Sequence, residues 1–457
     1  MLTKDQLAIQ TLGECTRRSP LNLSTIPNDE IADFVDDRAR VLMHVESLDG
    51  QEVDTSLSFE KAGPREHIHF DPAQTRVAVV TCGGLCPGLN HVIRSIVLEL
   101  HYTYRVKEVL GYRYGYEGLN RDRGVKPIRL GIDEVRNIHR QGGSFIGVSR
   151  GAEDPQVMVN TLEAHDVQIL LTVGGDGTLK GAHAIHEEVA RRGLDIAVVG
   201  VPKTIDNDVD FVDKTFGFDT AVELAQLAIN GAHTEALSAR NGIGLVKVMG
   251  RDSGFIAAAA TLASLEVNFC LVPEVHFDLE GPNGLLLALE RRLRDRGHAV
   301  IVAAEGCAKS LVSEQSERDA SGNVRYADAS ADIGLYLKQA LGRYFKQVGM
   351  PCTIKYIDPS YIIRSVPANA QDSVFCDILA RHAVHAGMAG KTDLVIGRIH
   401  NVFTHVPLPL ATARRKQIDP DSGFWLAVTE TTGQPSLSNM PVSRRADAWY
   451  REQTTRR

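Results

Sequence analysis

Residues 167–190 read VQILLTVGGDGTLKGAHAIHEEVA, and this stretch decides the fold class. An apolar run rich in branched side chains leads into two glycines, and an amphipathic helical pattern follows. A short apolar run of this kind is typical of a strand that is buried on both faces, as in a parallel sheet covered by helices. The stretch therefore predicts a strand, a glycine turn and a helix.

The same order recurs before and after this stretch. Residues 75–82 form another β-branched run, which meets the turn GGLCPGLN and a helical pattern from His91. Further strand patterns begin at Leu194, Asn241 and His298, with a helix expected from about Thr220. Strands that alternate with helices predict an α/β fold with parallel sheets and helices on both faces. Ligands of such sheets bind at the carboxyl ends of the strands, where every polar motif below is found.

The chain has 457 residues, more than one compact domain usually takes. Because a domain typically holds about 100–200 residues, we expect two domains and flanking segments. Residues 1–74 show weak periodicity and predict an extension that wraps or links subunits. Residues 75–220, completed by about 365–410, predict one α/β domain, and residues 221–364 predict a second. Residues 411–457 form a C-terminal segment, within which the basic stretch from 444 onward predicts a docked or frayed tail, and the polar block 317–330 predicts a surface loop.

Composition argues against several classes of partner. The net charge of -7 gives no overall attraction to nucleic acid or to anionic lipid. Seven scattered cysteines suit a reducing compartment, and Cys82 and Cys86 have no second pair nearby for a zinc site. No secretory signal is visible, and the longest apolar stretch, 255–265, is about half the ~20 residues of a membrane span. We expect a cytoplasmic protein with neither nucleic acid nor membrane as partner.

The loop at 83–90, GGLCPGLN, follows a predicted strand. Glycines at such a point let backbone N–H groups approach a phosphate, and the positive end of the next helix points the same way. Gly83 is therefore a candidate phosphate contact. The loop lacks the Lys-Ser/Thr of a Walker A motif, and by itself it is equally compatible with a simple tight turn.

The segment GGDGT at 174–178, extended by Gly181, is more specific. Gly175 and Gly177 bring backbone close to a polyphosphate, Asp176 offers a hard oxygen for Mg²⁺, and Thr178 can donate to a phosphate oxygen. The alternative is a turn with a helix-capping Asp or Thr. The motif indicates a nucleotide-dependent kinase and leaves the acceptor open, because lipid and NAD kinases carry it too.

The segment PKTIDND at 202–208 packs polar residues directly after a buried strand. Such side chains are costly to bury unless they bind something. Asp206 is the candidate base for an acceptor hydroxyl, Asp208 could bind metal directly or through water, and Lys203 could neutralise phosphate. The alternative is a solvated acidic turn.

Further charged residues stand at strand ends. Arg251, in MGRDSG at 249–254, could stabilise charge on a moving phosphoryl group, and Arg150 could reach a phosphate that bridges donor and acceptor. Glu305, at the end of another strand, could bind a sugar hydroxyl. For Arg251 the alternative is a surface arginine beside a helix start, and for Arg150 and Glu305 it is one half of a structural ion pair.

The last motif is KYIDPSYIIR at 355–364. Lys355, Arg364 and Tyr361 would suit a distal phosphate, such as the 6-phosphate of a sugar. A basic strand edge would look similar.

Taken together and in this order, the segments GGDGT, PKTIDND, MGRDSGF and AEG resemble the phosphofructokinase family over residues 75–405. The resemblance is greatest to its long-chain ATP-dependent branch, known from plants and trypanosomatid protozoa. It implies two Rossmann-like parallel-sheet domains, a nucleotide-binding one at 75–220 completed by about 365–410 and a sugar-phosphate-binding one at 221–364. It implies MgATP and fructose 6-phosphate as substrates. It also implies an allosteric enzyme of glycolysis that forms a cytoplasmic homotetramer. 

The resemblance also implies roles for single residues. It places the catalytic base at Asp206, and it assigns Arg251 and Thr204 to the catalytic site. Nucleotide contacts fall at Gly83, Arg150, Gly175, Gly177, Thr178 and Gly181, with Mg²⁺ at Asp176. Sugar-phosphate contacts fall at Thr204, Asp206, Asp208, Met249, Gly250, Arg251, Glu305, Lys355, Tyr361 and Arg364.

Some positions depart from the short bacterial members of the family. Gly242 stands where those enzymes have an arginine that reaches a neighbouring subunit's substrate, and Lys355 and Tyr361 replace an arginine and a histidine. Asn268 stands where a glutamate helps hold their nucleotide effector. We therefore do not expect control by the same effector.

The choice of phosphoryl donor depends on two positions. Pyrophosphate-dependent relatives generally carry Asp where this chain has Gly177, and a carboxylate there would crowd and repel the α-phosphate of ATP. Lys203, however, is shared with the pyrophosphate enzymes. Because Gly177 acts by exclusion, we predict MgATP as donor and the 1-hydroxyl of fructose 6-phosphate as acceptor. A pyrophosphate-dependent enzyme, an NAD or lipid kinase, and a non-catalytic regulatory subunit stay open as alternatives.

Overall fold

The computed structural model describes residues 2–24, 26, 33–46, 53–307, 316–318, 324–326 and 332–440. These residues divide into two compact units. The first takes its residues from Met1–Ala221, Ser316–Arg325 and Tyr361–Lys416, and the second from Val222–Gln315, Tyr326–Ser360 and Gln417–Arg457. The basic tail predicted from 444 onward lies outside the described residues. So does most of the loop predicted at 317–330, apart from the paired strands β14 (Ser316–Arg318) and β15 (Val324–Tyr326).

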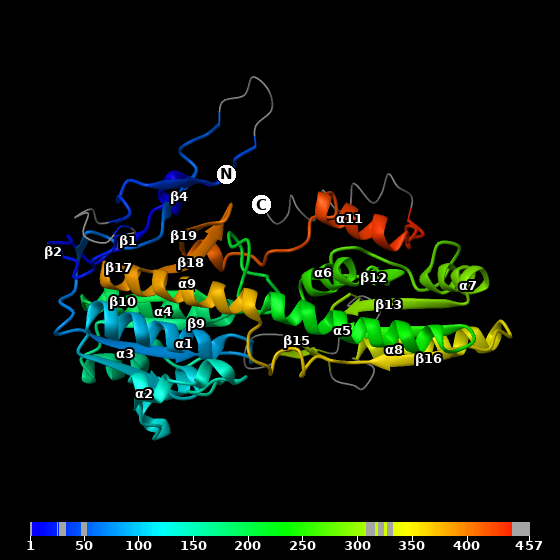
Figure 1. Cartoon of the computed structure of the whole chain (residues 1–457), viewed down its shortest axis with the longest axis horizontal. Helices are drawn as coiled ribbons and strands as arrows, with labels where there is room; N and C mark the ends of the chain where they lie inside the picture. The colour runs from blue at the N-terminus through cyan, green and yellow to red at the C-terminus, as the bar shows by residue number, and fades with distance from the viewer. Residues whose placement is uncertain are drawn as a thin grey trace. The chain divides into compact units, whose positions relative to one another are not determined.

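The first unit is built on a nine-stranded sheet (Figure 1). Its strands lie in the order β3 (Arg40–Leu42), β4 (Ser58–Lys61), β19 (Val402–Pro407), β18 (Leu394–Ile399), β10 (Ala197–Pro202), β9 (Ile169–Gly174), β6 (Arg76–Thr81), β7 (Glu108–Tyr112) and β8 (Ile128–Arg129). All residues of β9 and β10 are buried, as the apolar runs predicted. The parallel core, from β18 to β7, confirms the predicted fold class.

The edges of this sheet differ from the all-parallel arrangement that the sequence suggested. Strand β8 is antiparallel to β7, and β19, β4 and β3 continue the other edge in antiparallel fashion. Strands β18 and β19 form a hairpin whose turn residues, His400 and Asn401, have φ angles of 50° and 64°. A two-residue hairpin turn needs this left-handed conformation, which asparagine tolerates better than most residues.

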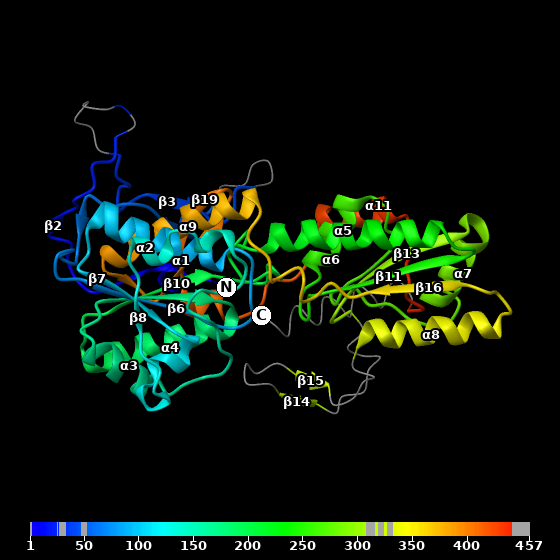
Figure 2. The same ribbon diagram turned by 60° about the horizontal axis from the view of Figure 1, so that its bottom comes forward.

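Helices cover both faces of the sheet. Figure 2 shows α1 (Leu89–Leu98) and α9 (Ala370–Met388) on one face, and α3 (Pro155–Ala164) and α4 (Asp176–Arg192) on the other. Helix α4 ends at Gly193, whose φ of 64° is readily reached by glycine. The short helices of this unit are α2 (Ile132–Val135), α10 (Leu408–Ala411), the π-helix η2 (Glu99–Tyr104), and the 3-10 helices η1 (Lys4–Leu7), η3 (Gly115–Leu119), η4 (Arg121–Arg123) and η5 (Ile138–Arg140).

The N-terminal extension contributes strands to this unit, which its weak periodicity did not indicate. Besides β3 and β4, β1 (Gln10–Thr11) pairs with β17 (Lys391–Thr392), and β2 (Arg17–Arg18) pairs with β5 (His67–Ile68). Glu60 of β4 is buried and bonds Arg65 at 3.1 Å and His405 at 3.0 Å. Burial would raise the pKa of Glu60, but His405, Lys391 and Arg65 outweigh burial and lower the pKa to about 2. This ionised carboxylate therefore fastens the extension to the sheet.

The second unit has a four-stranded parallel sheet in the order β12 (Phe269–Leu271), β13 (His298–Ala304), β11 (Gly242–Val248) and β16 (Thr353–Ile357). Helix α6 (Phe255–Ser264) covers one face, and α7 (Leu285–Arg296) and α8 (Ile333–Gln347) cover the other, as right-handed crossovers require (Figure 2). Helix α5 (Phe218–Leu237) begins in the first unit, and α11 (Gly423–Thr432) packs on α6.

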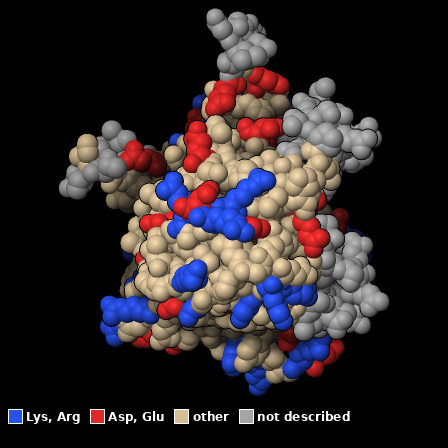
Figure 3. Space-filling view, turned by 90° about the vertical axis from the view of Figure 1, so that its right-hand side faces the viewer, with Lys and Arg blue, Asp and Glu red and all other residues tan. Residues whose placement is uncertain are grey.

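Basic side chains gather in clusters on the face drawn in Figure 3. The last turns of α7 and α8 carry Arg294, Arg296 and Lys346. Cations at these positions stabilise the helices, because the unpaired carbonyl groups of a helix C-terminus carry partial negative charge. Of the helices in the described ranges, none combines the length and apolar character needed to cross a membrane.

Candidate active site

Three cations of the first unit surround the loop that follows β6. The Lys203 Nζ donates to the carbonyl oxygen of Gly84 at 2.8 Å. A Cβ built on Gly84 would lie 3.3 Å from Nη2 of Arg150 and 3.4 Å from Nη1 of Arg364. A Cβ on Gly83 would lie 3.3 Å from Nζ of Lys203. Three positive side chains at a glycine turn make a strong site for an anion.

Backbone hydrogen bonds bring Arg150 to this loop. Gly83 has a φ of 84°, and its N–H donates to the carbonyl of Ser149 at 2.8 Å. Only glycine adopts this φ at little cost, and the backbone conformation therefore explains why glycine occupies position 83. The same bond places Arg150, the next residue after Ser149, beside the glycines.

Lys203 is buried, which its place in a polar loop did not predict. Burial lowers the pKa of Lys203, while nearby thiols and Asp206 act in the opposite direction. Its ammonium group is partly satisfied by the Gly84 carbonyl. Lys203 therefore supports the glycine loop from within the protein, in addition to any charge it offers to a phosphate.

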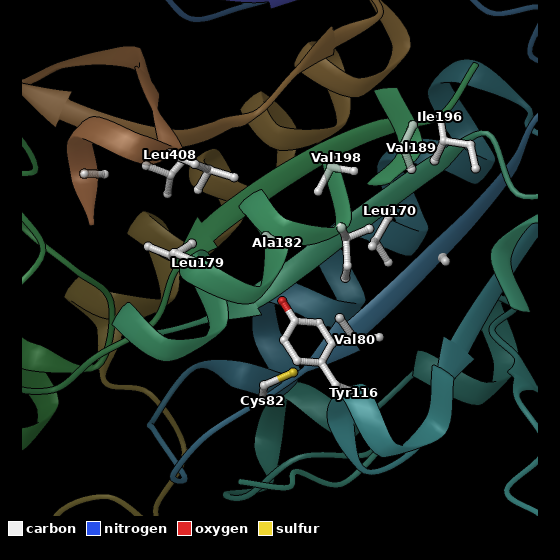
Figure 4. Close-up of a cluster of buried hydrophobic side chains, with 14 of the residues drawn as sticks. Val80, Cys82, Tyr116, Leu170, Leu179, Ala182, Val189, Ile196, Val198 and Leu408 are labelled. Carbon is white, nitrogen blue, oxygen red and sulfur yellow. The ribbon is translucent and has the colours of Figure 1, made fainter. Parts of the chain in front are cut away.

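Helix α4 begins directly at Asp176, so Asp176, Gly177 and Thr178 lie in its first turn, while Gly174 ends β9 and Gly175 is the N-cap. Packing explains two glycines of the motif. A Cβ on Gly174 would lie 2.1 Å from Oγ1 of Thr178, and one on Gly181 would lie 2.6 Å from the Tyr116 ring. Figure 4 shows the Tyr116 ring below α4, and its hydroxyl donates to the Thr178 carbonyl at 2.6 Å.

This packing bears on two predicted nucleotide contacts. Thr178 is only 6% exposed, and Gly181 is needed so that Tyr116 can fit. Packing alone therefore explains why threonine and glycine occupy these two positions. Their contact with a nucleotide stays a prediction. Gly175 lies at the N-cap of α4, where a Cβ would come 3.2 Å from the Lys203 carbonyl.

Gly177 is different from the other glycines of the motif. It is exposed, and a Cβ built on it meets no atom within 4 Å. Its backbone is helical, and the protein therefore offers no packing reason for glycine at this position. The space beside the first turn of α4 is open to a ligand.

The loop after β10 is closed by its own side chains. The Thr204 hydroxyl donates to Asp208 Oδ1 at 3.0 Å and accepts from the backbone N–H of Asp206 at 3.1 Å. Asn207, with a φ of 54°, accepts from the backbone N–H of Thr215 at 3.0 Å through its side chain. Asn207 is thus a turn former, and the Thr204 hydroxyl holds the Asp208 carboxylate and the backbone of Asp206.

Arg415 lies between two of the predicted site carboxylates, and the sequence analysis missed it. Its Nη2 is 3.8 Å from Asp176 Oδ2, and its Nη1 is 3.7 Å from Asp208 Oδ2. Burial raises the pKa of Asp208, although Arg415 and Thr204 act in the opposite direction. The two carboxylates come from separate motifs, and the shared guanidinium indicates that they lie close together. The sequence shows a basic run, RRK at 414–416, but this run does not indicate that Arg415 contacts carboxylates some 200 residues earlier in the chain.

In the second unit, the predicted residues Arg251 and Glu305 form an ion pair. Arg251 Nη2 lies 3.1 Å from Glu305 Oε1, and both side chains are about one-third exposed, at 30% and 37%. Gly250 has a φ of 127°, and its carbonyl accepts from the N–H of Gly306 at 3.0 Å. The ends of β11 and β13 are therefore bound together, with Met249 at the same strand end.

Two lysines of the second unit form ion pairs with carboxylates that the sequence analysis did not predict. Lys355 Nζ lies 3.0 Å from Glu235 Oε2, and both side chains are largely exposed. Lys247 Nζ lies 2.7 Å from both Asp332 and Asp358. Because Asp332 caps α8 and Asp358 follows β16, Lys247 fixes the chain just before the predicted Tyr361.

Each unit thus gathers part of the predicted site. The first unit brings together Gly83, Arg150, Lys203 and Arg364 at one loop, and Asp176 and Asp208 at Arg415. Thr204 lies beside Asp208 and the backbone of Asp206. Tyr361 also belongs to the first unit, and the Arg364 guanidinium stacks over its ring at 4.6 Å. The second unit brings together Met249, Gly250, Arg251 and Glu305, and it holds Lys355 on β16. Lys355 and Arg364, predicted as one cluster, belong to different units.

Comparison with known proteins identifies the family. The sequence profile described as Phosphofructokinase matches residues 76–387. The chain belongs to the phosphofructokinase family. Curated relatives named ATP-dependent 6-phosphofructokinase include one from Borreliella burgdorferi, 48% identical over 94% of this chain and 97% of its own length. Another, from Amycolatopsis methanolica, is 44% identical over 94% of this chain and 95% of its own.

Solved structures of this phosphofructokinase family share the fold. A pyrophosphate-dependent phosphofructokinase from Marinobacter aquaeolei aligns with a TM-score of 0.64 at 20% identity, covering 80% of this chain and 92% of its own. The phosphofructokinase of Pichia pastoris in the T-state aligns with a TM-score of 0.60 at 22% identity, covering 78% and 39%. These likenesses confirm the architecture predicted from the strand and helix pattern.

Proposed function

We propose that this chain is an ATP-dependent 6-phosphofructokinase of glycolysis. It transfers a phosphoryl group from MgATP to the 1-hydroxyl of D-fructose 6-phosphate, giving fructose 1,6-bisphosphate and ADP. The observation that carries the proposal is 44–48% identity over 93–94% of the chain with relatives that bear this name. The site geometry of each unit supports it independently.

The first unit supplies the donor site in this proposal. Arg150 and Lys203 lie at the Gly83–Gly84 turn, where backbone N–H groups and positive charge suit a polyphosphate. The N-terminus of α4, with Gly175 and Gly177, adds the positive end of a helix. Electrostatic preorganisation of this kind stabilises the charge that develops on a transferred phosphoryl group.

Two features support ATP over pyrophosphate. The open space at Gly177 leaves room for the part of ATP that pyrophosphate lacks. Lys203, the feature shared with pyrophosphate-dependent relatives, donates to a protein carbonyl from a buried position. Its presence is therefore explained by support of the glycine loop and does not require pyrophosphate.

Asp176 and Asp208 would hold Mg²⁺. Mg²⁺ prefers one or two carboxylates together with substrate phosphates and waters, and these two carboxylates share one cation already. Within the described ranges, no three His, Cys, Asp or Glu side chains gather into a metal site, so phosphate and water would complete the coordination. When bound, the metal neutralises phosphate charge and orients the donor.

Asp206 acts as the general base toward the 1-hydroxyl. The Thr204 hydroxyl accepts from the Asp206 backbone N–H, so the carboxylate is presented from a fixed turn. Arg251 neutralises charge on the phosphoryl oxygens, and Glu305 accepts from a sugar hydroxyl. Their ion pair at 3.1 Å orients both side chains before substrate binds. Met249, Gly250, Lys355, Tyr361 and Arg364 complete the sugar-phosphate contacts, with the second unit as the main sugar-phosphate-binding domain.

Purified protein with fructose 6-phosphate and Mg²⁺ tests this function when ATP is compared with pyrophosphate. We expect turnover with ATP at least about tenfold above that with pyrophosphate, measured as fructose 1,6-bisphosphate formation. The reverse preference would make this a pyrophosphate-dependent enzyme. Phosphorylation of NAD or diacylglycerol instead of the sugar would favour another GGDGT kinase, and no turnover with any donor would favour a non-catalytic subunit.

The proposed assembly is a homotetramer, as the family resemblance implies. Sedimentation of the purified protein would show one species of about four times the mass of the 49.9 kDa chain. A cytoplasmic location and allosteric control by effectors other than those of the short bacterial enzymes belong to the same proposal.

A further inference from the structure

A basic segment runs alongside the acidic loop that carries the proposed base. Arg415 pairs with Val209 as an isolated antiparallel bridge, and the N–H of Lys416 donates to the Asp208 carbonyl at 3.0 Å. Arg414 Nε donates to Asp210 Oδ2 at 2.5 Å. The segment and the loop therefore bind to each other through both backbone and side chains.

Lys416 fixes the backbone of this segment. Its Nζ donates to the carbonyls of Val212 at 2.6 Å and Asp213 at 3.0 Å. The position of the neighbouring Arg415 is thus set by the protein before any ligand binds.

Arg415 uses its two terminal nitrogens on two different carboxylates. The distances are 3.8 Å to Asp176 and 3.7 Å to Asp208. These separations lie near the outer limit of an ion pair, and the Arg415 side chain is 31% exposed. Asp208, in contrast, is buried. Asp176 Oδ2 also has a closer cation, Lys180 Nζ at 3.0 Å. Arg415 is therefore the cation that Asp176 shares with Asp208, and it is the second of two cations beside Asp176.

We propose that Arg415 is a positioning residue of the metal site, which holds Asp176 and Asp208 together in the free protein and competes with the divalent cation for them. The inference rests on the proposed function, in which these carboxylates receive Mg²⁺. A divalent cation between the two carboxylates would lie close to the guanidinium, and like charges repel. The metal alone therefore binds weakly.

A metal that arrives with a polyphosphate meets a different balance of charge. The phosphates would bring negative charge, which would offset the repulsion between the metal and Arg415 and would pair with the guanidinium. Arg415 thereby favours the metal–nucleotide complex over the bare ion. Arg415, which would provide this preference for the metal–nucleotide complex, lies outside the glycine-rich segments 83–90 and 174–181.

Binding of Mn²⁺ alone, followed by electron paramagnetic resonance without nucleotide or sugar, tests this role. We expect Arg415→Met to bind Mn²⁺ at least tenfold more tightly than the wild type, because a competing charge has been removed. Arg414→Met is the matched control, since Arg414 pairs with Asp210 outside the two carboxylates, and its Mn²⁺ affinity should stay within twofold of wild type. Equal or weaker Mn²⁺ binding by Arg415→Met, or no binding by either protein, would overturn the proposal.

Two further variants keep the test sharp. Arg415→Lys retains the charge and should restore an affinity near that of the wild type, even if the Met variant folds poorly. Asp208→Asn should weaken Mn²⁺ binding, and Arg415→Met should then gain less in that background. Because no sugar or nucleotide is present, these outcomes do not depend on which substrate the enzyme uses, whereas failure of the proposed function would appear only in the turnover assay.

Discussion

Replacement of Gly177 by aspartate isolates the choice of donor from the stability of the fold. Gly177 is exposed in the first turn of α4, and an added Cβ meets nothing within 4 Å. Substitution of glycine by alanine in a helix generally stabilises by about 1 kcal/mol, and an acidic residue in a first turn adds a few tenths more. Both Gly177→Ala and Gly177→Asp should therefore fold at least as well as the wild type.

The effect on ATP follows from charge. If a carboxylate at this position comes within about 4–5 Å of a bound α-phosphate, the two like charges repel by about 3–4 kcal/mol at an effective dielectric constant of 20. Mobility of the aspartate and screening by salt reduce this value to about 2–3 kcal/mol, or a 30- to 200-fold loss in kcat/KM for ATP. The alanine variant adds no charge and should lose less than about fivefold.

Steady-state rates with ATP and with pyrophosphate, together with thermal melting curves, measure this prediction. Gly177→Asp should lose ATP activity while its melting temperature is unchanged or higher, and its rate with pyrophosphate should not fall. If Gly177→Asp keeps kcat/KM for ATP within threefold of the wild type, or if the alanine variant loses as much as the aspartate variant, charge exclusion at this position is wrong.

Three other changes have defined outcomes. Asp206→Ser should lower kcat by at least about 10²-fold with little change in the KM for fructose 6-phosphate, and near-normal turnover would end its assignment as the base. Lys247→Met leaves two carboxylates without their shared cation and should destabilise the second unit by about 2–4 kcal/mol in urea unfolding, whereas Lys247→Arg should recover part of the loss. Burial lowers the pKa of His382 and of His385 to about 3. Below pH 6.5 these rings are therefore protonated in the unfolded chain but stay neutral in the folded chain, so the stability of the fold decreases as the pH drops toward 3. At pH 5 each ring should lower the free energy of unfolding by about 2 kcal/mol relative to pH 7. The double variant His382→Gln with His385→Gln should show a smaller change in urea midpoint between pH 7 and pH 5 than the wild type, and an equal change would contradict this prediction.

The fold could be predicted because its signals are local. The buried runs at β6, β9 and β10, each followed by glycines and a helical pattern, correspond to the observed parallel core. The family followed from the order of the motifs, and the comparisons confirm it. The antiparallel edge strands were missed because short strands such as β3 and β8 are too brief to show a period.

The sequence could not separate glycines that serve packing from glycines that leave space. Within GGDGT and its extension, Gly174 and Gly181 make room for Thr178 and Tyr116, while Gly177 borders open space. Tyr116 lies about 60 residues from these positions in the chain, and no spacing rule relates them. The meaning of each glycine depends on which atoms lie within 4 Å.

The amino-acid sequence by itself determined the strand ends at which polar residues gather, because backbone propensity and hydrophobic period act over a few neighbouring residues. Tertiary structure alone decided that Arg364 meets the Gly83–Gly84 turn, and that Arg415 lies between Asp176 and Asp208. Charges attract through space with no regard to their separation along the chain, so a partner 200 residues away leaves no trace in the local pattern.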